Sequence, residues 1–191
     1  MSPLSEAEQQ SLLRLARQAI EAIVLDTELT EFNCPEGPLT QQAGAFVTLH
    51  RSGRLRGCMG NIESPKPLHQ TVCDCARSAA LRDPRFDPVT AAEIPQLHIE
   101  ISVLSPLEPA RPDQIEVGRH GLLVSNGYQR GLLLPQVATK YHWDREKFLD
   151  ETCLKAGLSS DAWRHGARIQ VFTAQIFAEP TSPARTSHHA A

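Results

Sequence analysis

The spacing of the apolar residues changes along the chain, and this change limits the folds that the sequence can adopt. Residues 5–25 carry apolar side chains at helical spacing, and Ser5 and Glu8 are placed to form a capping box. Residues 45–50 and 97–104 instead alternate apolar and polar side chains with a period of two, which is typical of strands. The pattern predicts an α+β fold in which helices flank a sheet.

Turn-forming residues suggest how these strands are connected. Ser52 and Gly53 separate two short strands, and Asn126-Gly127 predicts a second hairpin within 115–134, because both turn residues tolerate a positive φ. Further helices are predicted near 67–81 and 144–156, and a final strand over 168–177. Since hairpins dominate, we expect a mixed, largely antiparallel sheet.

A chain of 191 residues is long enough for one domain with an additional lobe. We expect a single domain over residues 8–178, made of a larger lobe and a small lobe within 26–60 or 106–145. Prolines punctuate both of these segments. Residues 179–191 are polar and are expected to form a frayed tail.

Composition narrows the classes of function. A net charge of −3 gives no basic stripe for phosphate backbones, so nucleic acid is not expected as a partner. No apolar run is long enough to cross a bilayer and no export signal is visible, so a cytoplasmic protein without a membrane partner is expected. Five scattered cysteines fit reduced thiols. No dinucleotide fingerprint or P-loop occurs, so the cofactor stays unassigned.

The segment from Arg54 to Gly60 is the first candidate for chemistry. Gly57 and Gly60 flank Cys58 in a predicted turn, where backbone amides could approach a ligand closely. The two nearby guanidinium groups, those of Arg54 and Arg56, would favour the Cys58 thiolate, the form that acts as a catalytic nucleophile. The alternative is that Cys58 is a small buried residue and the glycines only permit the turn. We favour the packing role of Cys58 over a role in covalent chemistry. For the binding of a ligand, however, this turn is the leading candidate site.

A second candidate lies after the predicted helix, where Asp83 stands between Arg82 and Arg85. An arginine fork held by a carboxylate can bind a phosphate or carboxylate. The same residues could instead cap the helix and form salt bridges at its end, and the sequence leaves both interpretations open.

The predicted helix near 67–81 carries two residue types that commonly bind metals. His69 and Cys73 are four residues apart and would project from one helix face, with Cys58 as a conceivable third ligand. No complete metal-binding motif occurs, so no metal is predicted, and His69 is retained only as a candidate ligand-binding or capping residue.

Six motifs occur in order along the chain: GAFVTL at 44–49, LRGCMG at 55–60, AALRDPRF at 79–86, IEISVLSP at 99–106, GLLLPQVA at 131–138 and CLKAGL at 153–158. Together they resemble the AMMECR domain family over about residues 8–178. Met59 replaces the isoleucine usual in the family's hexapeptide, a swap that keeps the apolar volume. The resemblance implies an α+β fold with a larger and a smaller lobe.

The resemblance also implies partners. Bacterial members resemble protein A of the AmmeMemoRadiSam system, encoded beside a Memo-like protein and a radical-SAM protein. It implies no catalytic residue or cofactor. We therefore expect either a protein that binds or modifies a small anionic substrate at the Arg-Gly-Cys-Met-Gly turn, or a non-catalytic interaction module. Binding of a nucleotide or RNA is a third, less favoured hypothesis.

Overall fold

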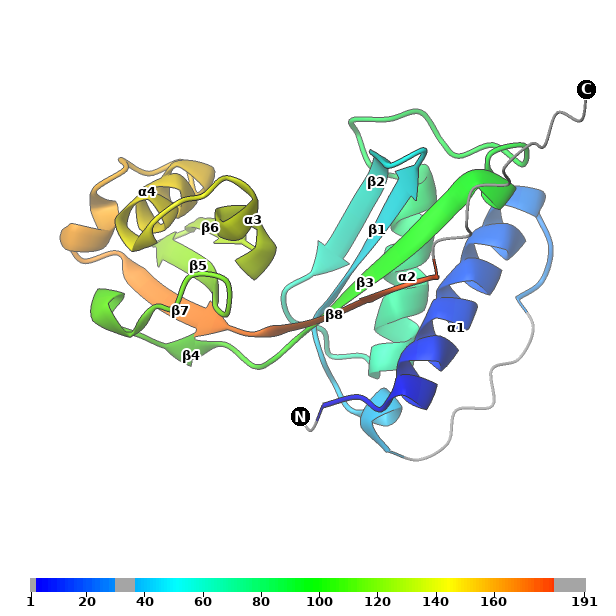
Figure 1. Ribbon diagram of the computed structural model, residues 1–191, viewed down its shortest axis with the longest axis horizontal. Helices are drawn as coiled ribbons and strands as arrows, with labels where there is room; N and C mark the ends of the chain where they lie inside the picture. Colours follow the sequence, from blue (N-terminus) through cyan, green and yellow to red (C-terminus); the bar gives the residue numbers. More distant parts are fainter. Residues whose placement is uncertain (1–2, 30–36, 181–191) are drawn as a thin grey trace, which may run out of the picture.

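The computed structural model describes residues 3–29 and 37–180, which form two lobes joined by extended chain (Figure 1). The larger lobe contains two helices and a sheet of order β2-β1-β3-β8. Its elements are α1 (Glu6–Leu25), β1 (Ala45–Arg51), β2 (Arg54–Asn61), α2 (Leu68–Leu81), β3 (Leu97–Leu104) and β8 (Ala174–Ala178). The smaller lobe contains the second sheet, of order β4-β7-β5-β6, and two further helices.

The elements of the smaller lobe are β4 (Glu108–Pro109), β5 (Gly121–Asn126), β6 (Gln129–Leu133), α3 (Pro135–Lys140), α4 (Arg145–Lys155) and β7 (Arg168–Phe172). Short 3-10 turns lie at Pro38–Thr40, Ile94–Gln96, Pro112–Gln114 and Ala162–Arg164. All strand ladders of the described residues are antiparallel. The predicted α+β class is therefore confirmed, with two sheets in place of one.

The first helix forms where its capping residues predict. The Ser5 hydroxyl accepts a hydrogen bond from the Glu8 backbone N–H, and the Glu8 carboxylate accepts one from the Ser5 backbone N–H. Two N–H groups that the helix cannot pair are thereby satisfied. The helix ends at Asp26, which adopts a left-handed conformation. Among the residues described, no helix combines the length and the apolar content needed to span a bilayer.

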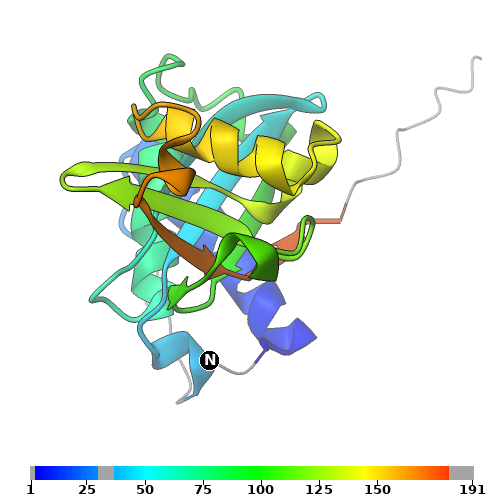
Figure 2. The ribbon, with the colours of Figure 1, turned by 90° about the vertical axis from the view of Figure 1, so that its left-hand side faces the viewer.

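One face of the larger sheet packs against both helices. The period of two places Val47, Leu49, Ile99 and Ile101 on this face, and all four are fully buried. The opposite face is turned toward the smaller lobe, as two perpendicular views agree (Figures 1 and 2). We call this second surface the open face of the larger sheet.

The predicted turn at 57–60 is wrong, because these residues lie inside β2. They pair with β1 as far as Asn61, opposite Ala45. The ladder shifts between Leu49 and His50, and Arg56 is the extra residue on β2. A bulge of this kind bends and twists a strand without ending it. The glycines that suggested a turn lie in the paired part of β2 that follows the bulge.

The run 168–177, predicted as one strand, is divided between the two sheets at Thr173. The chain passes from the larger lobe to the smaller at Ser105 and returns at Thr173. At this crossing the Ser105 backbone N–H donates to the Thr173 carbonyl, and the Thr173 N–H donates to the Ser105 hydroxyl, both at 2.9 Å. Glu179, the first residue of the expected tail, is held by Arg17, and residues 181–191 lie outside the described part of the chain.

The second hairpin forms as predicted, but its turn lies one residue further along. Asn126 pairs with Gln129, so Gly127 and Tyr128 are the two turn residues. Only Gly127 of this pair has a positive φ, at 59°, which is the pattern of a turn with glycine in its first central position. A β-carbon at Gly127 would meet no atom within 4 Å, so any cost of substitution comes from the backbone alone.

We therefore expect Gly127→Val to lower the free energy of unfolding by about 1 kcal/mol or more, through strain at positive φ. Tyr128→Val is the matched control, since Tyr128 is fully exposed and does not have a positive φ. It should change stability by less than about 0.5 kcal/mol. Urea denaturation of both variants measures the difference, and equal effects would contradict this account of the turn.

Candidate functional site

The candidate site is centred on Cys58, which lies on the open face of the larger sheet. Cys58 is paired in register with Thr48, and Thr48 with Glu100, so the three side chains form a row across β2, β1 and β3. The Thr48 hydroxyl lies 3.3 Å from the Cys58 sulfur, to which it donates a hydrogen bond. The Cys58 side chain is partly exposed and therefore open to reagents.

The other described cysteines are buried. Burial raises the pKa of Cys73 and of Cys75 to about 11, and it also raises the pKa of Cys153. These thiols stay protonated at neutral pH. Cys58 is the one free cysteine of the described residues that combines exposure with neighbouring polar groups. Cys34 lies outside those residues.

The carboxylate of Asp83 connects Cys58 to Arg85. Because β2 is at the edge of its sheet, the Cys58 backbone N–H has no strand partner on its outer side, and it donates instead to Asp83 Oδ2 at 2.8 Å. Arg85 donates to both oxygens of the same carboxylate, from Nε at 2.9 Å and from Nη2 at 2.6 Å. These hydrogen bonds hold the pKa of the buried Asp83 carboxyl well below its usual range.

Arg85 is oriented by this contact but remains accessible. Its side chain is 54% exposed, although two of its nitrogens are bound to Asp83. The guanidinium also lies 5.5 Å from the centre of the Phe86 ring. Its pKa is raised, chiefly by the hydrogen bond to Asp83 and to a smaller extent by the charge that Cys58 carries when ionised. A free edge of Arg85 can therefore receive an anion close to the thiol.

Arg56 is more fully engaged within the protein. Its three guanidinium nitrogens donate to the Glu93 carboxylate and to the carbonyl oxygens of Asp87 and Pro88. The pKa of Glu93 falls to about 2, mainly because of the hydrogen bond from Arg56. Arg56 and Arg85 line one hollow of about 500 Å³ on the outer side of β2. Arg56 thus forms part of the wall of the hollow, and all three of its guanidinium nitrogens are already engaged by the protein.

The two glycines serve packing rather than ligand approach. A β-carbon at Gly57 would overlap the Ala79 carbonyl of α2, and one at Gly60 would overlap the Phe46 ring. The expectation that these positions leave space for a ligand is therefore wrong, because the protein itself fills both spaces. The glycines allow β2 to lie close to α2 and allow an aromatic ring to cover the strand.

Among the described residues, His69 lines a different cavity, and the Arg82 side chain forms no hydrogen bond or ion pair with Cys58, Asp83 or Arg85. The His69 Nδ1 is 2.9 Å from the Leu39 carbonyl, and the ring lines a separate cavity of about 240 Å³ with Cys73. Arg82 caps the end of α2 and is exposed. Within residues 3–29 and 37–180, no group of three or more His, Cys, Asp or Glu side chains is suited to holding a metal ion. The structure thus brings Arg56, Asp83 and Arg85 close to Cys58, leaves Gly57 and Gly60 beside it in β2 as packing residues, and places His69 at a separate cavity.

Sequence reasoning missed Thr48 and one role of Glu93. Strand alternation places Thr48 outside the core, but only the register with β2 shows that it meets Cys58. Thr90 and Glu93 are spaced as in a capping box, and the Glu93 carboxylate accepts a hydrogen bond from the Thr90 N–H at 2.9 Å. It also binds Arg51 and Arg56, which no local pattern indicates.

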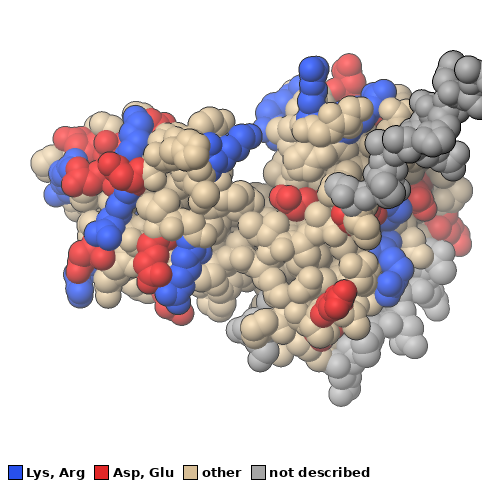
Figure 3. Space-filling model, in the orientation of Figure 1, with Lys and Arg blue, Asp and Glu red and all other residues tan. Residues whose placement is uncertain are grey.

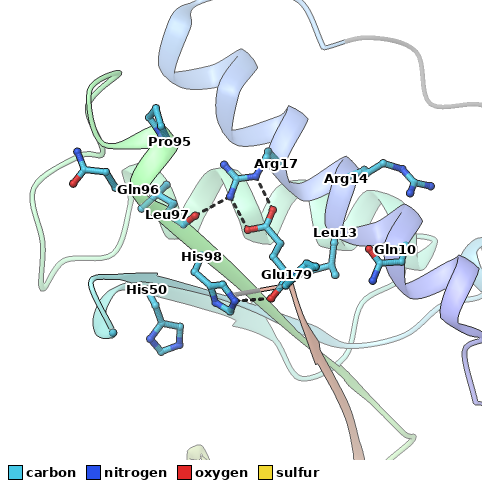
Figure 4. Close-up of a pocket in the computed structure, with 12 residues that line it drawn as sticks. Gln10, Leu13, Arg14, Arg17, His50, Pro95, Gln96, Leu97, His98 and Glu179 are labelled. Atoms are coloured by element: carbon cyan, nitrogen blue, oxygen red, sulfur yellow. Dashed lines mark hydrogen bonds and ion pairs between the residues drawn. The ribbon is translucent and has the colours of Figure 1, made fainter. Parts of the chain in front are cut away.

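A larger cavity, of about 750 Å³, lies elsewhere, beside α1 and the end of β8 (Figure 4). At its centre Arg17 faces Glu179, and the two form a bidentate ion pair with both distances at 2.6 Å. Arg17 also donates to the carbonyl oxygens of Ile94 and Leu97. The charges of Arg17 and Glu179 neutralise each other, so neither is left to bind a charged ligand. We therefore interpret this ion pair as a structural contact that holds Glu179 against α1, and we do not choose this cavity as the candidate site.

Comparisons with known proteins agree with this architecture. The AMMECR1 family model matches residues 13–177. The Methanosarcina barkeri protein Mbar_A1807 is 44% identical, over 92% of both chains, and the Thermococcus kodakarensis protein TK0174 is 42% identical over 91% of this chain and 92% of its own. The crystal structure of the uncharacterized protein PH0010 from Pyrococcus horikoshii superposes with a TM-score of 0.81 at 41% identity, covering 88% of this chain and 89% of that one. The family predicted from the six motifs is confirmed: this chain belongs to the AMMECR1 family.

Proposed function

We propose that the protein is a cytoplasmic AMMECR1-family member that binds a small anionic substrate beside Cys58, with Cys58 as the candidate catalytic nucleophile. The observation that carries the proposal is the Asp83 carboxylate, which binds the Cys58 backbone N–H and the Arg85 guanidinium at the same time. A single buried carboxylate thus holds the backbone of the candidate nucleophile and a cation. Such fixed geometry lowers the cost of orienting a substrate.

The chemistry of these side chains suits an anionic partner. Two of the three Arg85 nitrogens are held by Asp83, so an anion would meet a guanidinium whose orientation is already set. A thiolate at Cys58 would then attack an electrophilic carbon of the bound molecule, forming a carbon–sulfur bond while the bond from that carbon to its leaving group breaks and the leaving group departs to solvent with the electron pair. By family resemblance, Memo-like and radical-SAM proteins are the proposed partners of this activity.

A second candidate function is a non-catalytic interaction module. This alternative is favoured because the residues of the motif make contacts within the protein. Gly57 and Gly60 pack against Ala79 and Phe46, respectively. Arg56 forms an ion pair with Glu93. In that case the motif maintains β2, and the surface around it contacts another protein. Reactivity of the thiol distinguishes the two candidates.

Cys58 should be the most reactive described cysteine toward iodoacetamide at pH 7, with Cys73, Cys75 and Cys153 reacting at least about tenfold more slowly because burial holds them protonated. The thiolate sulfur displaces iodide in every case, so rates are directly comparable. Timed labelling of the native protein, followed by peptide mass spectrometry, measures each rate. If Cys58 labels as slowly as the buried thiols, the interaction module is the better account.

The role of Arg85 can be separated from general thiol reactivity by comparing anionic iodoacetate with neutral iodoacetamide. The ratio of their rates at Cys58 should fall about two- to fivefold in Arg85→Gln, because a guanidinium near the surface contributes up to about 1 kcal/mol to attracting an anion. Arg82→Gln is the matched control, since Arg82 is exposed and lies three residues away in the same segment. An equal fall in both variants would show that only net charge matters.

The Asp83 contact also predicts a dependence of stability on pH. The pKa of Asp83 is lower in the folded protein than its unfolded value of about 3.9, so the ionised carboxylate stabilises the fold above that pH and loses this effect as the pH falls. Asp83→Asn should cost about 2 kcal/mol at pH 7. The difference from the wild type should shrink as the pH falls below about 4.

Unfolding by urea at pH 7 and at pH 3 measures this change. Asp113→Asn is the control, since it removes an exposed carboxylate paired with Arg111 and should leave the stability almost unchanged at both values. A difference between wild type and Asp83→Asn that stays constant with pH would show that the carboxylate charge is not the source of the stabilisation.

A further inference from the structure

Two arginines and a serine form a row on the smaller sheet. Ser125 of β5 is paired in register with Arg130 of β6 on one side and with Arg168 of β7 on the other. Residues directly opposite each other in antiparallel strands project from the same face, with β-carbons about 5 Å apart. The Ser125 hydroxyl therefore lies between two guanidinium-bearing side chains.

This row is on the face that the helices of the smaller lobe leave uncovered. The alternate residues Leu122, Val124 and Ile169 pack into the core formed with Phe148 and Leu149 of α4. The row must consequently face the other way, toward the larger lobe. A cavity of about 360 Å³ lies there, lined by Ser125, Gly127, Arg130, Arg168 and Gln170 together with Leu107, Leu123 and Glu63.

The cavity includes residues from both sides of the gap between the lobes. Glu63 follows β2 in the larger lobe, whereas Arg130 and Arg168 belong to the smaller one. Figure 3 shows this gap with basic side chains on both of its sides. Leu123, which is only 3% exposed, supplies an apolar floor beside the polar row. The cavity is thus a shaped site with polar walls.

The two arginines that line this cavity have no ion-pair partner among the described residues. Arg14, Arg54, Arg77, Arg82 and Arg145 share this property, but Arg130 and Arg168 are brought together in one cavity. Arg51, Arg56, Arg85, Arg111, Arg119 and Arg164 all have a carboxylate within ion-pair distance. In the described part of the chain, no such carboxylate pairs with Arg130 or Arg168. Glu63, the single carboxylate that lines the cavity, forms no ion pair with either arginine. Two like charges brought onto one face without a counter-ion repel each other, and a bound anion would offset this repulsion.

We propose that this cavity binds the phosphate group of a small phosphate monoester. Two guanidinium groups can each donate two parallel hydrogen bonds to a phosphate, and the Ser125 hydroxyl and Gln170 amide lie beside them to complete the set of donors. A volume of about 360 Å³ suits a small metabolite. Glu63 at the edge disfavours longer polyanions and can accept a hydrogen bond from a hydroxyl or ammonium group of the ligand. This site is distinct from the proposed Cys58 site, since it shares no residue with it and all of its donor side chains belong to the smaller lobe.

The full-length protein should be titrated with inorganic phosphate and with O-phosphoethanolamine at constant ionic strength, while the arginine Nε–H and backbone amide signals are followed by NMR. Saturable shifts are expected at Arg130 and Arg168, with O-phosphoethanolamine binding more tightly than phosphate because its ammonium group can reach Glu63. Arg130→Gln and Arg168→Gln should each weaken binding about tenfold. Arg119→Gln, which removes an exposed, carboxylate-paired arginine of the same lobe, should leave binding unchanged.

Thermal melting shows at the same time whether each variant folds. Because Arg130 and Arg168 have no ion pair to lose, their variants should keep the wild-type melting temperature without ligand and lack its increase with O-phosphoethanolamine. Equal weakening in Arg119→Gln, or tighter binding of a single-stranded oligonucleotide, would show attraction of any polyanion and overturn the proposal. Shifts confined to Cys58 and Arg85 would also overturn it while supporting the first site. Slow labelling of Cys58 would contradict the first proposed site only, because phosphate binding at Arg130 and Arg168 does not require a reactive Cys58.

Discussion

The double crossing between the lobes is the constraint on which both sites depend. Ser105 and Thr173 lie side by side where the chain leaves and re-enters the larger lobe, and two hydrogen bonds join them. A paired crossing resists rotation more than a single linker would, because both strands must move together. The uncovered faces of the two sheets are therefore held toward each other, with Cys58 on one lobe and the Arg130–Ser125–Arg168 row on the other.

Asp83 resolves a second constraint, the unpaired edge of β2. An edge strand exposes N–H groups that could pair with another chain, and proteins commonly block such groups with charge. Here the blocking carboxylate is buried, so it requires a cation, and Arg85 supplies one. The same contact leaves a guanidinium at a fixed place near Cys58. Edge protection and the orientation of an anion-binding group thus come from one interaction.

The sequence predicted the residue types of the first site but not their geometry. Arg56, Cys58, Asp83 and Arg85 were found because cysteine, glycine and arginine occur together in short segments. The roles of the glycines depended on α2 and on Phe46, which are far away in sequence, so a turn was inferred where a strand exists. Arg130 and Arg168 escaped notice because no local pattern connects residues that meet only through the register of β5 with its two neighbours.

Periodicity located most helices and strands, and the place where it failed shows its physical limit. Ile169 and Val171 face the core of the smaller lobe, and Phe177 faces the core of the larger one. All three positions have the same parity, so the alternation continues through Thr173 although the strand changes sheets there. An extended chain keeps its period of two whichever neighbour it pairs with. The strand changes sheets because its first half pairs with β5 in the smaller lobe and its second half pairs with β3 in the larger lobe. These partners lie elsewhere in the sequence, so the residues of 168–177 do not indicate where the change occurs.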